Sequence, residues 1–165
     1  MKVWTEKSQV KGREDWVNEE PIRLMRYTTL PVLLDFLERK KLVLLDPENW
    51  DDRNDSEVIL GYKEKKGIKN LFALCFSYGP ETIHHWKTFA NGSSGCRIEF
   101  NAEKLMTIFE KEGLMHGKVD YRKISDVKSE SFELDHMPFI KRAPYACESE
   151  YRVLWEGDTK DKVYE

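Results

Sequence analysis

The sequence lacks the long apolar segments that membrane and secreted proteins need. It has no run of about 18 consecutive apolar residues, the length of a membrane-spanning helix. Its first residues, MKVWTEKSQVKGREDW, also lack the apolar core of a signal peptide. Three cysteines, Cys75, Cys96 and Cys147, are an odd number without a C-x-x-C pair, which disfavours a disulfide framework and a structural zinc site. We therefore expect a cytoplasmic protein with reduced thiols and no membrane partner.

An excess of charge of one sign is also absent. The chain has 27 Lys plus Arg against 30 Asp plus Glu, a net charge of −3, although charged residues make up 35% of its 165 residues. Binding to nucleic acid needs a basic excess, at least locally, so net charge does not indicate a nucleic-acid partner. Aromatic residues make up 12% of the chain, which is enough for a packed core in one domain.

Hydrophobic periodicity predicts an irregular N-terminal arm at residues 1–20 and a single α+β domain at residues 21–165. Strands and helices do not alternate as a βαβ repeat, so we expect a mixed or split antiparallel sheet with helices on its faces. Leu33, Leu34 and Leu37 form an apolar stripe that is predicted to face the core. The expected strands are 22–27, 42–45, 70–77, 96–100, 117–122 and 148–155, and the expected helices are 28–38, 56–67, 81–90 and 101–111, with a helix-like region at 124–135.

Familiar cofactor and metal motifs are missing. There is no G-x-G-x-x-G and no G-x-x-x-x-G-K-[ST]. His84 and His85 are adjacent, so on a helix they diverge by about 100° and cannot share an ion. The acidic residues at 51–57 do not follow the order of a calcium loop, and a solvated loop is the favoured interpretation. We therefore predict no bound metal.

The run Cys147-Glu148-Ser149-Glu150-Tyr151-Arg152 stands out because it places two carboxylates one residue apart at the start of a predicted strand. Residues two apart on a strand point to the same face, so Glu148 and Glu150 should lie side by side. Repulsion and burial raise the pKa of one member of such a pair, which suits acid, base or cation-stabilising chemistry. A solvated edge strand, with Arg152 neutralising its neighbours, is about equally consistent with the pattern.

Three segments resemble a family of bacterial proteins of unknown function, some of whose relatives are associated with phage abortive infection. They are RYTTLPVLLDFLERKKLVLLDPENWDD (26–52), CFSYGPETIHHWKTFANGSSGCRIEF (75–100) and KRAPYACESEYRVL (141–154). The order of elements is also similar to the ADP-ribosyltransferase fold, in which residues on the first, a middle and a late strand surround NAD. The middle strand departs from that pattern, because it reads F-S-Y where S-T-S is common.

The second resemblance implies a site for NAD as substrate and an unknown acceptor. Glu150 would stabilise the ribosyl cation, as a carboxylate does in glycosidic cleavage, and Glu148 would orient or deprotonate the acceptor. Arg26 would hold the pyrophosphate, and Ser77 would lie on the middle strand.

Tyr27 or Trp86 could stack on the nicotinamide in that arrangement. The ordinary alternatives are a core position for Trp86 and an ion pair of Arg26 with Glu148 or Glu150. The alternative function is a non-catalytic interaction or sensing module of a defence system, which would contact a partner through the acidic loop 51–57 and the aromatic residues of the arm.

Overall fold

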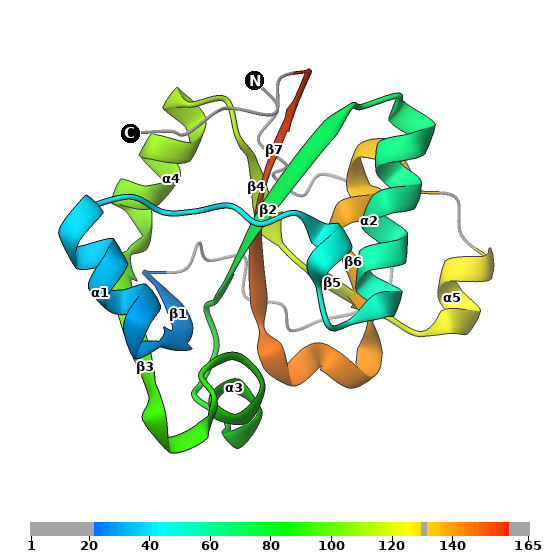
Figure 1. Cartoon of the computed structure of the whole chain (residues 1–165). Helices are drawn as coiled ribbons and strands as arrows, with labels where there is room; N and C mark the ends of the chain where they lie inside the picture. The colour runs from blue at the N-terminus through cyan, green and yellow to red at the C-terminus, as the bar shows by residue number, and fades with distance from the viewer. Residues whose placement is uncertain (1–21, 130–131, 159–165) are drawn as a thin grey trace.

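A five-stranded antiparallel sheet forms the centre of the domain. The computed structural model describes residues 22–129 and 132–158, so the predicted arm at 1–20 lies outside the described residues. The strand order is β3-β1-β2-β7-β4, and β5 and β6 form a separate parallel pair. This arrangement, with helices packed on the sheet (Figure 1), confirms the predicted single α+β domain. The strands are β1 (Arg23–Thr29), β2 (Asn70–Ser77), β3 (Gly95–Asn101), β4 (Met115–Lys118), β5 (Asp120–Arg122), β6 (Ile140–Arg142) and β7 (Glu150–Gly157).

Local capping interactions set where several helices begin. The side chain of Asp52 accepts hydrogen bonds from the backbone N–H groups of Asn54 and Asp55, and Asn101 accepts one from Lys104. Helix boundaries are close to those predicted. The helices are α1 (Leu30–Arg39), α2 (Arg53–Lys66), α3 (Ile83–Phe89), α4 (Ala102–Lys111) and α5 (Ile124–Ser129), and the 3-10 turns are η1 (Pro47–Asn49), η2 (Gly92–Ser94), η3 (Leu134–Phe139) and η4 (Ala143–Glu148). Among the described helices, none is long and apolar enough to cross a membrane.

The two faces of the sheet carry separate cores. On the first face, Leu24, Leu74 and Val153 pack with Leu105 and Phe109 of α4. On the second face, a smaller cluster unites α2 with β2, η3 and β7, and α2 and α1 lie on opposite sides of the sheet in Figure 1. Because side chains alternate along a strand, β2 and β7 contribute to both cores. The second cluster consists of Ile59, Tyr62, Leu71, Ala73, Phe139 and Leu154.

The sheet is split between β1 and β2. These strands pair only at Met25 and Ser77, whereas β2 and β7 pair along their full length. Further along β2, Ala73 pairs instead with Leu45, which precedes η1. Between the two pairing points, the carbonyl of Cys75 accepts a hydrogen bond of 2.9 Å from Nη1 of Arg26. The guanidinium therefore fills the gap in the backbone ladder where the strands diverge.

Two predictions about the apolar segments near α1 are wrong. The residues Leu34 and Leu37, predicted to face the core, are 57% and 49% exposed. The segment 42–45 is not a buried strand, because only Leu45 makes a ladder contact and Val43 is 57% exposed. Helical periodicity grouped Leu34 and Leu37 correctly, whereas Leu33 is half-buried, and periodicity alone does not say whether an apolar stripe is covered.

Candidate functional site: a buried ion-pair network around Glu150

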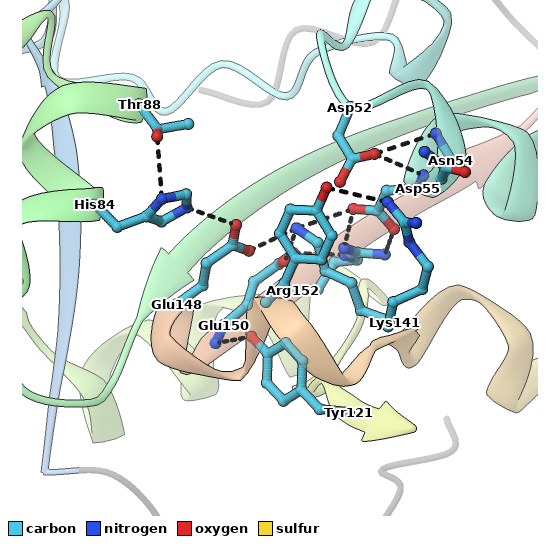
Figure 2. Close-up of polar contacts among 12 residues, drawn as sticks. Asp52, Asn54, Asp55, His84, Thr88, Tyr121, Lys141, Glu148, Glu150 and Arg152 are labelled. Atoms are coloured by element: carbon cyan, nitrogen blue, oxygen red, sulfur yellow. Dashed lines mark hydrogen bonds and ion pairs between the residues drawn. The ribbon is translucent and has the colours of Figure 1, made fainter. Parts of the chain in front are cut away.

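Five separate elements bring charged side chains together on the second face of the sheet. They are the first turn of α2, helix α3, strand β6, the turn η4 and the start of β7 (Figure 2). The chain can turn tightly between η4 and β7 because Ser149 adopts a left-handed conformation, with φ of 44°. Gly79 lies against this turn, and a Cβ there would approach Oγ of Ser149 to 2.2 Å. A glycine is thus needed where the end of β2 passes Ser149.

Glu150 is the centre of the network. It is 4% exposed, and its Oε1 accepts a hydrogen bond of 2.6 Å from Nε of Arg152. Its Oε2 lies 3.2 Å from Nζ of Lys141. The backbone N–H of Glu150 donates to the hydroxyl of Tyr121 at 2.8 Å. Both carboxylate oxygens and the amide of this residue are therefore engaged by protein groups.

Arg152 is completely buried and has a partner on every side. Its guanidinium forms a bidentate pair with Asp55, at 3.0 and 2.6 Å, and also donates to the carbonyl of Pro138 at 2.6 Å. The ring of Trp50 lies 5.3 Å from the guanidinium carbon, within cation–π range. Arg152 thus ties β7 to α2, η1 and η3.

Lys141 joins the two members of the E-x-E pair. Its Nζ lies 2.6 Å from Oε2 of Glu148 and 3.4 Å from Oδ2 of Asp55, in addition to its contact with Glu150. The Lys141 side chain is 8% exposed, and the three carboxylates are equally inaccessible. Three carboxylates thus share two cations in a region closed to solvent.

The electrostatic balance favours the charged form of these groups. Burial alone raises the pKa of Glu150, but Arg152 and Lys141 outweigh burial and lower that pKa to about 2. Burial lowers the pKa of Lys141, but the charges of Glu150, Asp55 and Glu148 raise it above its usual value. Burial and the charge of Glu150 raise the pKa of the nearby Cys75 thiol, which disfavours its thiolate form.

His84 carries the network toward the surface. Its Nε2 lies 3.1 Å from Oε1 of Glu148, and its Nδ1 lies 3.4 Å from the hydroxyl of Thr88. The His84 side chain is 35% exposed, whereas that of Glu148 is 5% exposed. His85, the next residue, points elsewhere: its Nε2 contacts the backbone carbonyl of Glu148 and its Nδ1 completes the capping box of α3 with Thr82.

The prediction for the E-x-E pair is partly wrong in its geometry. Glu148 ends η4 and is not on the strand, which begins at Glu150. The two carboxylates nevertheless meet, because Lys141 binds both of them. Arg152 neutralises Glu150 as the alternative interpretation proposed, but the pair is buried and not solvated.

The other predicted site residues are divided between the two faces of the sheet. Ser77 lies directly opposite Glu150 on the neighbouring strand and is 4% exposed, and its hydroxyl has no hydrogen-bond partner within the described part of the chain. Tyr27 shares this face and stacks on His85 at 4.6 Å, with Trp86 edge-on at 5.4 Å. Arg26 follows the alternation of β1 onto the opposite face, with Leu24.

Arg26 therefore does not join the network. Within residues 22–129 and 132–158 it forms no ion pair with Glu148 or Glu150, and its described polar contact is with the Cys75 carbonyl. Burial lowers its pKa. The alternative prediction of a salt bridge between Arg26 and the E-x-E pair is therefore wrong.

No protein-family profile, curated protein or solved structure matches the chain at a significant level. The resemblances to a bacterial family of unknown function and to ADP-ribosyltransferases thus stay predictions from the residue patterns.

Sequence reasoning missed four members of the network: Asp55, His84, Lys141 and Tyr121. Lys141 opens the segment KRAPYACESEYRVL (141–154), one of the three that carry the family resemblance, but it had no assigned role. Asp55 was hidden among other acidic residues of a predicted loop. Its position three residues after the N-cap Asp52 places it in the first turn of a helix, and this was the available signal.

The carboxylates of Glu148 and Glu150 are occupied by Lys141 and Arg152 in this conformation. Among the described residues, no group of three His, Cys, Asp or Glu side chains could hold a metal ion. The His84 imidazole is the accessible end of the chain from Glu150 through Lys141 and Glu148. The arrangement is well suited to holding five elements in fixed positions.

Proposed function

We propose that this chain is a non-catalytic interaction module, with the E-x-E pair serving as a structural lock. The observation that carries the proposal is the closure of Glu150, whose two carboxylate oxygens are bound by Arg152 and Lys141 at 4% exposure. A carboxylate that stabilises a ribosyl cation must touch the ribose, and both oxygens of this one are already bound by Arg152 and Lys141.

Part of the acidic loop is already engaged within the fold. Asp52 caps α2 and Asp55 is buried against Arg152, so both carboxylates already have structural partners. The exposed apolar side chains of α1 are the more suitable contact surface, because large apolar groups at the surface mark interaction sites. A role in phage defence rests on the sequence resemblance alone.

The test is an assay of nicotinamide release and label transfer, with purified protein, labelled NAD and protein or nucleic-acid acceptors. We expect no release above the buffer background from the wild-type protein and none from Glu150→Gln. Release that Glu150→Gln abolishes, with circular dichroism showing a folded variant, would overturn the proposal. Glu103→Gln, an exposed change on α4, is the matched control for the substitution itself.

A second candidate is an NAD-dependent ADP-ribosyltransferase, and one observation favours it. Strands β1, β2 and β7, which carry Tyr27, Ser77 and Glu150, are neighbours in the sheet, and the unpartnered hydroxyl of Ser77 faces Glu150. In this case Glu150 would have to exchange Lys141 for a ribose hydroxyl when NAD binds. The same assay decides between the candidates, with Ser77→Ala as an additional variant.

A further inference from the structure

Helix α1 exposes more apolar surface than an ordinary helix of a single domain. None of its residues is buried, and Leu30, Leu34 and Leu37 are 49%, 57% and 49% exposed. Their spacing of four and three residues places them in one stripe along the helix. The inner side of α1 rests on the sheet through Phe36, whose ring meets Phe100 at 5.6 Å.

The two ends of α1 also differ in their electrostatic partners. Its first turn has no acidic residue, and Thr29 makes no side-chain capping bond, so the N–H groups there have no side-chain acceptor within the helix. Near the other end, Asp35 pairs with Arg39, whereas Glu38 is exposed and has no ion pair among the described contacts. The first turn therefore lacks the negative group that the helix dipole favours there, and Glu38, next to the basic residues Arg39 and Lys40, is a carboxylate that could supply one.

These features fit together when two copies of the helix run antiparallel. A twofold axis between residues 33 and 34 maps position 30 onto 37 and position 38 onto 29. Leu30 then meets Leu37 of the second copy, and Leu34 meets its own counterpart near the axis. Glu38 reaches the uncapped N-terminus of the partner helix at Thr29, and the stripe spans about 10 Å at 1.5 Å per residue.

We propose that α1 pairs with α1 of a second copy of this chain, antiparallel about an axis near Leu34, with Glu38 capping the partner helix. This contact rests on the proposed function, since it makes the chain an interaction module whose partner is itself. The pairing closes by symmetry, so it produces a dimer and not a filament.

Sedimentation velocity over a concentration series tests the pairing. We expect the full chain to show a monomer–dimer equilibrium and Leu34→Glu to raise the dissociation constant at least tenfold. Ile124→Glu on α5 is the matched control, because Ile124 is also 57% exposed and α5 lies far from α1 (Figure 1). Glu38→Lys should weaken the dimer, and Glu57→Lys on α2 should not. A wild-type chain that is monomeric at every concentration overturns the proposal.

Cysteine cross-linking tests the position of the axis. In a Cys147→Ser background, Leu34→Cys should form a dimer through one disulfide, and Ile124→Cys should not. Equal cross-linking of the two variants overturns the antiparallel geometry. A monomer in which the thiol of the Leu34→Cys variant reacts with maleimide more slowly than the thiol of the Ile124→Cys variant indicates that another segment of the same chain covers α1. That result also overturns self-pairing.

The outcomes for the two proposals are separable. A monomer without nicotinamide release overturns the self-pairing and leaves the non-catalytic role standing. A dimer that releases nicotinamide overturns the non-catalytic role and leaves the pairing standing.

Discussion

Each face of the sheet has one region that departs from the usual rule that apolar side chains are buried and charged side chains are exposed. On one face, Glu150, Arg152 and Lys141 are buried at the centre of five elements, and on the other face the leucines of α1 are about half exposed. Buried charges are costly unless each is paired, and exposed apolar groups lose stability that burial would supply. The buried network therefore fixes five elements relative to one another beside the two apolar cores, and α1 is the region with apolar surface left to bury.

The network is the more fragile of the two regions. An ion pair that loses one member leaves a buried charge without compensation, so single substitutions there should cost far more than substitutions of equal size on α1.

Removal of the Arg152 guanidinium is the largest expected effect. Arg152→Leu leaves Asp55 and Glu150 buried with only Lys141 between them, and the free energy of unfolding should fall by about 3–5 kcal/mol. Urea unfolding followed by circular dichroism measures this change. Arg53→Leu, an exposed arginine at the start of α2, is the control and should change stability by less than about 1 kcal/mol. A small loss for Arg152→Leu would show that the network is not a structural lock.

Acid should weaken the network next. The pKa of Glu150 is about 2 in the folded chain, below its ordinary value of 4.5. A carboxyl group with a lowered pKa contributes stability that is fully present above its unfolded pKa and is lost as the pH falls through its folded pKa. Between about pH 5 and pH 2, the contribution lost should approach about 3 kcal/mol.

Urea titrations at several pH values across this range measure the slope of stability with pH. Glu150→Gln removes the titrating group and should have a shallower slope than the wild type, although it is less stable at pH 7. Parallel slopes for the two proteins would mean that Glu150 is not the carboxyl group responsible.

A smaller effect is expected from the hydroxyl of Tyr121. Tyr121→Phe leaves the backbone N–H of Glu150 without an acceptor in a buried position, which should cost about 1–2 kcal/mol. The same unfolding experiment measures it, and Tyr145→Phe is the control, since its hydroxyl accepts from a half-buried Arg142. Equal losses for both variants would show that the Tyr121 hydroxyl contributes no more to stability than the Tyr145 hydroxyl.

Much of the fold could be predicted from the sequence because it depends on local signals. The alternation in Cys96 to Phe100 and the caps at Asn101 and Asp52 act within a few residues, and the corresponding elements are present. The long-range part of the network could not be predicted, because Arg152 and Asp55 are 97 residues apart and meet only after the strands are ordered. The exposure of Leu34 could not be predicted either, because helical spacing identifies an apolar stripe but does not say whether another element packs on it.

The exposed stripe should respond least in a dilute solution of monomers. Leu34→Ala removes side-chain atoms that are already largely in water, and alanine favours a helix, so the free energy of unfolding should change by less than about 1 kcal/mol. Leu24→Ala, the same change at a position with 0% exposure, should cost about 2–5 kcal/mol. Because the two substitutions remove identical atoms, the difference between their losses in free energy of unfolding measures the stabilisation that burial of Leu34 would add. If Leu34→Ala costs as much as Leu24→Ala at high dilution, the stripe is already covered in the monomer, and α1 is not the region that is free to bind.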